Sequence, residues 1–170
     1  MSAVLDAPPT LDPRALRQTL GRFATGITVI SARTDAGEEV AITANSFTSV
    51  SLDPPLVLWS VARDALSVSV FQRASHFVVH ILSEQQREIS QHFARRQADK
   101  LTAVAHSRDL DGGLVLPGSL ARLTCEPHQC IEAGDHSVFI ARVVSLTHTD
   151  DRPLLYFGGS YQSLMPAHPV

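Results

Sequence analysis

The stretch ITVISARTDAGEEVAIT, residues 27–43, decides the fold class of this chain. Its first seven and its last four residues are rich in β-branched side chains, which are typical of strands. Between them, TDAGEE is a turn sequence in which Gly37 can adopt the positive φ that a tight turn requires. The stretch therefore predicts a β-hairpin and, with it, an antiparallel sheet.

Further β-rich segments continue this pattern towards the C-terminus. They cover residues 56–60, 76–82, 120–132, 137–146 and 154–157. Gly134-Asp135 joins the third of these segments to the fourth as a second hairpin. Because most strands are joined in this way and helices do not alternate with strands, we expect a mainly β fold, an antiparallel barrel with peripheral helices. A doubly wound parallel sheet is excluded on the same ground.

Three helices are expected outside the barrel. Asp12 and Pro13 suit the N-cap and first position of a helix, and apolar residues at helical spacing follow them up to Phe23. A short helix is expected at residues 65–71. Ser83 and Gln86 have capping-box spacing, which predicts a helix that runs to about Phe93. Residues 94–118 are expected to be mostly loop.

Composition indicates an ordinary globular chain. It has 170 residues, of which 44% are hydrophobic and 18% charged, and its net charge is −3. We expect an N-terminal arm at residues 1–12 and one domain at 13–170. The slightly acidic balance argues against nucleic-acid binding. The longest apolar run, 56–61, is too short to span a bilayer, and the N-terminus lacks a secretory signal pattern, so a cytoplasmic protein without membrane contact is expected.

Several kinds of site are absent from the sequence. It has no GxGxxG after a strand, no GxxxxGK[ST], no HExxH and no GxSxG. Cys125 and Cys130 do not form a CxxC motif, and we interpret them as unpaired thiols, buried or half-buried. His76 and His80 have the spacing of one strand face, without a cluster of other ligands nearby. We therefore expect no metal site.

Residues 43–55 carry the clearest hint of function. They concentrate hydroxyl and amide side chains in an irregular stretch, and the apolar residues Phe47, Val50 and Leu52 indicate that it packs against something. A polar surface loop is one interpretation. A flavin site is another, because such a backbone can pair with a pyrimidine edge while apolar residues contact the dimethylbenzene edge. Chemistry alone leaves flavin as one candidate among several.

Six segments of the chain together resemble a known family. They are RFATGITVISA (22–32), ITANSFTSVSLDPPLVLWSV (42–61), HFVVHILSEQQREIS (76–90), HFARRQADKL (92–101), GDHSVFIARV (134–143) and PLLYFGGSY (153–161). Over roughly residues 14–164 the chain resembles the flavin reductase family with the FMN-binding split-barrel fold. The resemblance implies a Greek-key split barrel, a homodimer, and an NAD(P)H:flavin oxidoreductase that supplies reduced flavin to a partner monooxygenase. A non-catalytic flavin carrier of the same fold is the alternative.

The resemblance also implies site residues. Asn45, Ser46, Phe47 and Thr48 match the segment that wraps the isoalloxazine, and Ser60, Ala62, Arg63 and Ser67 match the strand and turn that reach towards the ribityl chain and phosphate. Lys100 matches a basic position near the phosphate or adenylate. His136 and Tyr161 match residues on the nicotinamide side, and His136 is expected to position the nicotinamide.

Three of these assignments have a structural alternative. Arg63 and Lys100 could be solvated charges, and His136 could cap a hairpin. Trp59 is interpreted as a core residue rather than a flavin stack. Trp59 and His80 also depart from the smaller residue and the Asn frequent in relatives. The expected cofactors are FMN or FAD and NADH, with NADPH as the alternative, since no Arg cluster for a 2′-phosphate is evident.

Overall fold

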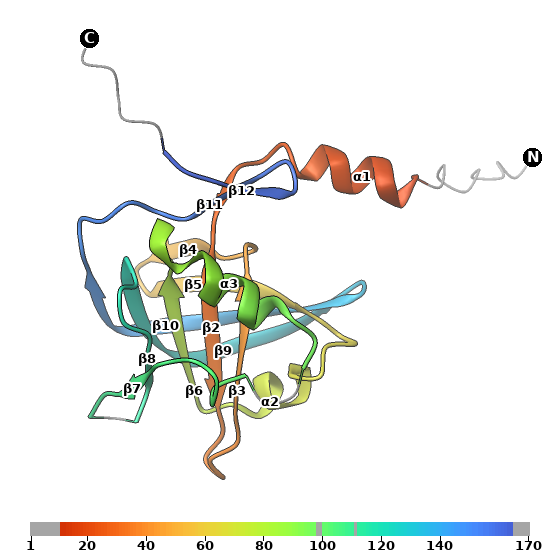
Figure 1. Cartoon of the computed structure of the whole chain (residues 1–170). Helices are drawn as coiled ribbons and strands as arrows, with labels where there is room; N and C mark the ends of the chain where they lie inside the picture. Colours follow the sequence, from red (N-terminus) through yellow and green to blue (C-terminus); the bar gives the residue numbers. More distant parts are fainter. Residues whose placement is uncertain (1–10, 98–99, 111, 165–170) are drawn as a thin grey trace, which may run out of the picture.

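A computed structural model describes residues 11–97, 100–110 and 112–164, and its main element is a seven-stranded antiparallel sheet. The strand order is β3-β2-β6-β9-β10-β5-β4. These strands are β2 (Thr28–Arg33), β3 (Glu39–Ala44), β4 (Thr48–Leu52), β5 (Pro55–Ala62), β6 (His76–Ile81), β9 (Ala121–Ala133) and β10 (His136–His148). The sheet curls until β3 at one end contacts β5 near the other (Figure 1). This arrangement confirms the antiparallel split barrel.

Smaller elements surround the barrel. Strands β1 (Thr25–Gly26), β11 (Leu155–Phe157) and β12 (Ser160–Gln162) form a three-stranded sheet, and β7 (Ser107–Arg108) pairs with β8 (Leu114–Val115). The helices are α1 (Pro13–Leu20), α2 (Val68–Arg73) and α3 (Arg87–Ala94), and the short 3-10 helix Glu84–Gln86 precedes α3. The helix expected at 65–71 begins and ends later, at Val68 and Arg73, because Ser67 occupies its N-cap position.

Both hairpins predicted from glycine turns are confirmed. Gly37 has φ +85° between β2 and β3, and Gly134 has φ +60° between β9 and β10. Strand β6 is buried on both faces, from Phe77 to His80. One face of β6 meets the barrel interior, and the other is covered by the chain around Leu114 and Leu116.

Two apolar clusters hold the barrel together. Inside it, Trp59 lies among three phenylalanines, with its ring centroid 5.0 Å from that of Phe77 and 6.0 Å from that of Phe139. Trp59 is fully buried there, as expected for a core residue. The second cluster lies under α3 and contains Phe93, Leu82 and Leu114. It fixes α3 against strands β2 and β3.

Helix α1 forms where expected, but the described part of the chain leaves its residues exposed. The Asp12 carboxylate accepts a hydrogen bond from the Arg14 amide (3.0 Å), and Pro13 occupies the first turn. None of its eight residues is buried, and it projects away from the barrel in Figure 1. Residues 1–10 of the expected N-terminal arm lie outside the described residues.

The two cysteines are free, as expected, but differ in exposure. Cys125 is buried, and this burial raises the pKa of its thiol to about 12. Cys130 is exposed, contrary to expectation, because the outer part of β9 extends beyond the barrel core. Within the described residues, no helix has the length and apolar character needed to cross a membrane, and no group of three or more potential metal ligands is found.

Candidate functional site

A cleft of about 780 Å³ opens where the two ends of the sheet approach each other. Strand β3 with Asn45 and Ser46 forms one wall, and the end of β5 with the turn into α2 forms another. The C-terminal end of α3, together with Lys100 and Leu101, closes the third side. A cleft of this volume is within the range of roughly 300–1,000 Å³ that small-molecule and cofactor sites occupy.

Strand β3 gives this cleft a polar backbone wall. It is an end strand of the seven-stranded sheet, and β2 is its only strand partner among the described residues. Alternate N–H and C=O groups of such an edge strand lack a strand partner. Ala41, Ile42 and Val61 add apolar surface beside these groups. A flat heteroaromatic ring with donors and acceptors along one edge fits such a wall.

Ser46 joins the two ends of the sheet beside the cleft. Its hydroxyl accepts a hydrogen bond from the Ser60 amide (3.1 Å) and donates to the Ser60 carbonyl (3.4 Å). Strand β4 pairs with β5 in the register Thr48↔Leu58, so Ser46 and Ser60 continue the same ladder with a side chain in place of backbone. The loop predicted to bind a ligand is therefore also the connection that closes the barrel.

Basic side chains gather at the α3 end of the cleft. The Lys100 ammonium donates to the Phe93 carbonyl (2.7 Å), and partial burial lowers the pKa of Lys100. Arg96 reaches the opposite wall, where its guanidinium binds the Asp64 carboxylate (3.1 Å) and carbonyl (3.0 Å). Arg95 also lines the cleft and has no side-chain hydrogen bond or ion pair within the described part of the chain. Two cations, Lys100 and Arg95, thus remain available to an anionic group.

His136 lies at the rim of the cleft, at the first position of β10. It is opposite Ala62 in the sheet register, and the turn at Gly134 places it there. Its Nδ1–H donates to the Asp135 carboxylate (2.7 Å), and this hydrogen bond lowers the pKa of Asp135. Because a carboxylate only accepts, Asp135 selects the Nδ1–H tautomer and leaves Nε2 for another partner.

The structure brings together most of the residues expected at the site. The cleft is lined by seven of them: Asn45, Ser46, Ser60, Ala62, Ser67, Lys100 and His136. The four others do not line it. Phe47 packs against the barrel core, and Thr48 begins β4 on the surface. Arg63 points to Glu132 on β9, with 3.7 Å between the charged atoms. Tyr161 lies behind α3, where its hydroxyl bonds to Ser90 (2.9 Å) under the guanidinium of Arg87.

Sequence reasoning missed a larger part of the cleft. It assigned no role to residues 39–42 of β3, nor to Arg95 and Arg96. The adjacent arginines were visible in HFARRQADKL, and a basic pair after a helix is a usable signal for an anion site. Which strand lies at the edge of the sheet is set by the topology, so no local pattern in β3 could have indicated its role.

Comparison with known proteins decides the family. The family described as "Flavin reductase like domain" matches residues 20–165, which is most of the chain. The chain belongs to the flavin reductase family. Stachydrine N-demethylase reductase subunit Stc3 of Rhizobium meliloti (strain 1021) is 45% identical over 150 residues, which are 88% of this chain. FMN reductase (NADH) SmoA of Agrobacterium fabrum is 41% identical over 150 residues, 87% of this chain.

Solved structures of flavin reductases have the same fold. The NADH:FAD oxidoreductase SgcE6 of Streptomyces globisporus C-1027, in complex with NAD and FAD fragments, superposes with a TM-score of 0.86 at 33% identity. That match covers 95% of this chain and 99% of SgcE6. The chain spans 84% of the length of SmoA but 65% of that of Stc3, and 48% of the length of two further relatives.

Proposed function

We propose that this chain is an NAD(P)H-dependent flavin reductase, with FMN or FAD as the flavin and NADH as the reductant. The observation that carries the proposal is the cleft between the two ends of the sheet, with its edge-strand wall, apolar side chains and two available cations. The volume of the cleft and its mixture of polar, apolar and basic lining residues suit a phosphorylated flavin. Membership of the flavin reductase family supports the same conclusion.

The flavin, when bound, supplies the redox chemistry by accepting a hydride from the nicotinamide, so the protein's task is to bind and orient two rings. Asn45, Ser46 and the edge of β3 offer backbone groups to the pyrimidine edge. Ser60, Ala62 and Ser67 line the path towards the phosphate, where Lys100 and Arg95 provide positive charge. No nucleophile or general base is required, in keeping with the absence of such motifs from the sequence.

His136 is assigned to positioning the nicotinamide cofactor. Its ring is half-exposed at the rim, and Asp135 holds its Nδ1, so Nε2 can hydrogen-bond a carboxamide or phosphate. Four expected residues do not line the cleft formed by the described residues: Phe47, Thr48, Arg63 and Tyr161. A direct role for them needs a second subunit near the cleft. His136→Ala should lower kcat/KM for NADH while the flavin Kd is unchanged.

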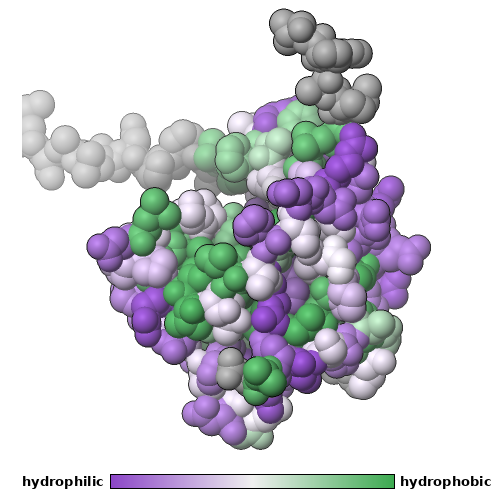
Figure 2. Space-filling model, turned by 90° about the vertical axis from the view of Figure 1, so that its left-hand side faces the viewer, coloured by the Kyte–Doolittle hydropathy of each residue, from purple (hydrophilic) through white to green (hydrophobic). Residues whose placement is uncertain are grey.

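A homodimer is part of this proposal. Exposed apolar side chains concentrate on α1 and its C-terminal extension (Leu16, Leu20, Phe23) and on the ends of β4 and β10. Figure 2 shows hydrophobic side chains gathered on one face of the barrel. Single chains seldom expose large contiguous apolar patches, and a second copy is the natural partner for an unpaired amphipathic helix. We also propose that residues 13–170 act as one domain.

The proposed recipient of reduced flavin is a separate oxygenase component. Stc3 bears the name of a reductase subunit, which favours a role as one part of a two-component system. A flavin carrier without turnover remains the second candidate function, because the cleft by itself accounts for binding as well as for reduction. The two candidates differ in whether NADH is consumed.

One experiment tests the function. NADH and NADPH oxidation is followed with FMN, FAD and riboflavin, and a thermal-shift series with each flavin is measured in parallel. We expect rapid NADH oxidation with FMN or FAD and an increase in Tm with either flavin. A Tm increase without NADH or NADPH oxidation would establish the carrier instead. If neither a Tm increase nor NAD(P)H oxidation is observed, the proposal that the chain binds flavin is refuted.

A further inference from the structure

A poorly exposed carboxylate lies in the wall of the cleft. Glu39 begins β3, and its side chain retains only 9% of its exposure to solvent. It lines the main cleft and also a smaller cavity of about 210 Å³ that Arg33 and Gly112 line as well. An unneutralised carboxylate at this place would repel any anionic ligand, and it would be costly to desolvate.

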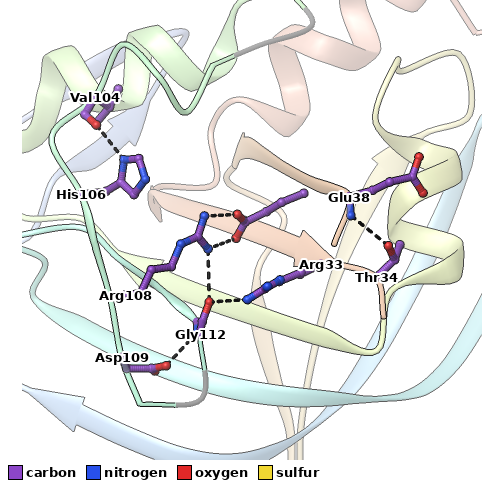
Figure 3. A network of polar contacts seen from close by, with 10 residues as sticks. Arg33, Thr34, Glu38, Val104, His106, Arg108, Asp109 and Gly112 are labelled. Atoms are coloured by element: carbon purple, nitrogen blue, oxygen red, sulfur yellow. Dashed lines mark hydrogen bonds and ion pairs between the residues drawn. The ribbon is translucent and has the colours of Figure 1, made fainter. Parts of the chain in front are cut away.

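Arg108 neutralises this carboxylate from a distant part of the chain. Its Nη1 donates to Glu39 Oε1 (2.7 Å), and its Nη2 donates to Glu39 Oε2, so the pair is bidentate. The hydrogen bonds that Arg108 donates to Glu39 raise the pKa of Arg108. Figure 3 shows the Arg108 guanidinium within a network of polar contacts that also includes Arg33 and Gly112. Bidentate pairs of this kind combine charge with fixed geometry.

Arg108 is delivered by a segment that we name the strap, residues 100–110 and 112–116. The Gly112 carbonyl accepts hydrogen bonds from Arg33 (2.9 Å) and Arg108 (3.2 Å), as Figure 3 shows. Asp109 is paired with Arg122 (3.0 Å), and Leu114 and Leu116 are buried in the cluster under α3. Gly112 has φ +77°, and a Cβ there would lie 2.4 Å from the Arg33 guanidinium. The strap is therefore closely fitted to the β2–β3 hairpin.

The same hairpin carries a second ion pair with a different environment. Glu38 binds Arg73 (2.9 Å), but both side chains are more than half exposed, and neither lines the cleft. Exposed pairs of this type contribute little to stability and are screened by salt. Two adjacent glutamates thus differ in burial and in their contact with the cleft, which makes Glu38–Arg73 a matched control.

We propose that Arg108 determines the specificity of the cleft for phosphorylated flavins by masking the charge of Glu39. This inference rests on the proposed function, since it takes the cleft as the flavin site. With Arg108 present, the Glu39 end of the cleft carries no net charge, and the phosphate responds to Lys100 and Arg95. Without Arg108, the carboxylate opposes the phosphate, while uncharged riboflavin is indifferent to it.

The test compares FMN with riboflavin in four variants. Flavin Kd values are measured by quenching of flavin fluorescence, and KM and kcat by NADH oxidation. Arg108→Ala should weaken FMN roughly tenfold relative to riboflavin, the loss expected for one charged contact at a partly exposed site. Arg108→Lys should keep most of the preference for FMN, and Glu39→Gln/Arg108→Ala should restore it to within about threefold. Arg73→Ala should resemble the wild type.

Glu39→Gln alone provides a test of sign that does not depend on the folding of Arg108→Ala. It removes the carboxylate and leaves the guanidinium, so the preference for FMN over riboflavin should rise. Equal losses of FMN and riboflavin in Arg108→Ala would make Arg108 a structural anchor and overturn the proposal, as would a Glu39→Gln variant that favours riboflavin. A wild type that binds no flavin would instead refute the proposed function.

Discussion

Helices α1 and α3 have the same length, eight residues, and both are amphipathic, yet only one is packed. Helix α3 buries Ser90 and Phe93 against the sheet, whereas α1 buries none of its residues. Both begin with good local signals, the Asp12 N-cap in one case and the bond from the Ser83 amide to the Gln86 side chain (3.1 Å) just before the other.

The difference shows that the caps decide where a helix forms, and the fold decides what its apolar face touches. The face of α3 meets a cluster built from β2, Leu82 and the strap. The face of α1 is exposed in the described part of the chain. Helix α3 therefore stabilises the barrel and forms part of the cleft. The apolar face of α1 is available to a second copy of the chain.

The largest expected effect comes from breaking the packed helix. Phe93 is fully buried, so Phe93→Ala should cost about 3–5 kcal/mol of unfolding free energy in urea titrations. Phe23, just beyond α1, is 78% exposed and provides the control. Phe23→Ala should change the unfolding free energy of the monomer by less than about 0.5 kcal/mol. Similar losses in both variants would contradict the distinction between the two helices.

The next largest effect is expected from acid, which should lower the unfolding free energy through His80. His80 is fully buried beside the strap, where its Nε2 accepts the Leu116 amide (3.3 Å). Burial and the nearby positive charge of Arg122 lower the pKa of His80 to about 4 from 6.5. The unfolded state therefore binds the extra proton, and stability present above pH 6.5 is lost as the pH falls towards 4, by about 3 kcal/mol.

His80→Asn isolates this effect from the other titrating groups. The asparagine cannot be protonated, so the difference between variant and wild-type unfolding free energies should be constant above pH 6.5 and should shift in favour of the variant below it. Urea titrations at several pH values between 4 and 8 provide the measurement. Parallel curves throughout would mean that His80 does not titrate in this range.

A smaller effect is expected on flavin binding when the basic residues near the C-terminal ends of α3 and α1 are compared. Lys100 caps α3 at the cleft, so Lys100→Ala should weaken FMN by about 1–2 kcal/mol more than riboflavin. Arg17 is the basic residue in the last turn of α1, away from the cleft. Arg17→Ala should leave both flavin Kd values unchanged. If Lys100→Ala weakens riboflavin binding as much as FMN binding, Lys100 does not contact the phosphate.

The smallest effect should appear in the exposed helix itself. Leu20→Ala should raise the dimer dissociation constant about fivefold, a loss of about 1 kcal/mol in association, because one apolar side chain of the proposed interface is shortened. Analytical ultracentrifugation over a range of concentrations gives this constant. Unfolding of the monomer should be unaffected. A dimer that is as tight as the wild type would exclude Leu20 from the interface.

Local features of the fold could be predicted from the sequence. Gly37, Gly134 and the Asp12-Pro13 start act through their own backbone, so the two hairpins and α1 followed directly from them. Trp59 was recognisable as core because a large aromatic on a buried strand has few alternatives. The resemblance to flavin reductases indicated seven of the residues that line the cleft.

Features that depend on distant pairing could not be predicted. The role of Glu39 requires both that β3 lies at an edge of the sheet and that Arg108, 69 residues away, folds back on it. The contact of Tyr161, on β12, with Ser90 of α3 likewise joins distant parts of the chain. Both outcomes follow from topology, which fixes side-chain neighbours that no local spacing encodes.

The Ser46 side chain, which bonds to both backbone groups of Ser60, has a consequence for sequence variation. The same hydroxyl closes the barrel and shapes the proposed flavin wall, so the two properties cannot be tuned separately at this position. In a saturation library at position 46, heat resistance and flavin retention should rise and fall together. Ala62 also lines the cleft, but its methyl group forms no hydrogen bond. Heat resistance and flavin retention should therefore vary independently at position 62, so cofactor preference can be engineered more freely on β5 than in the loop.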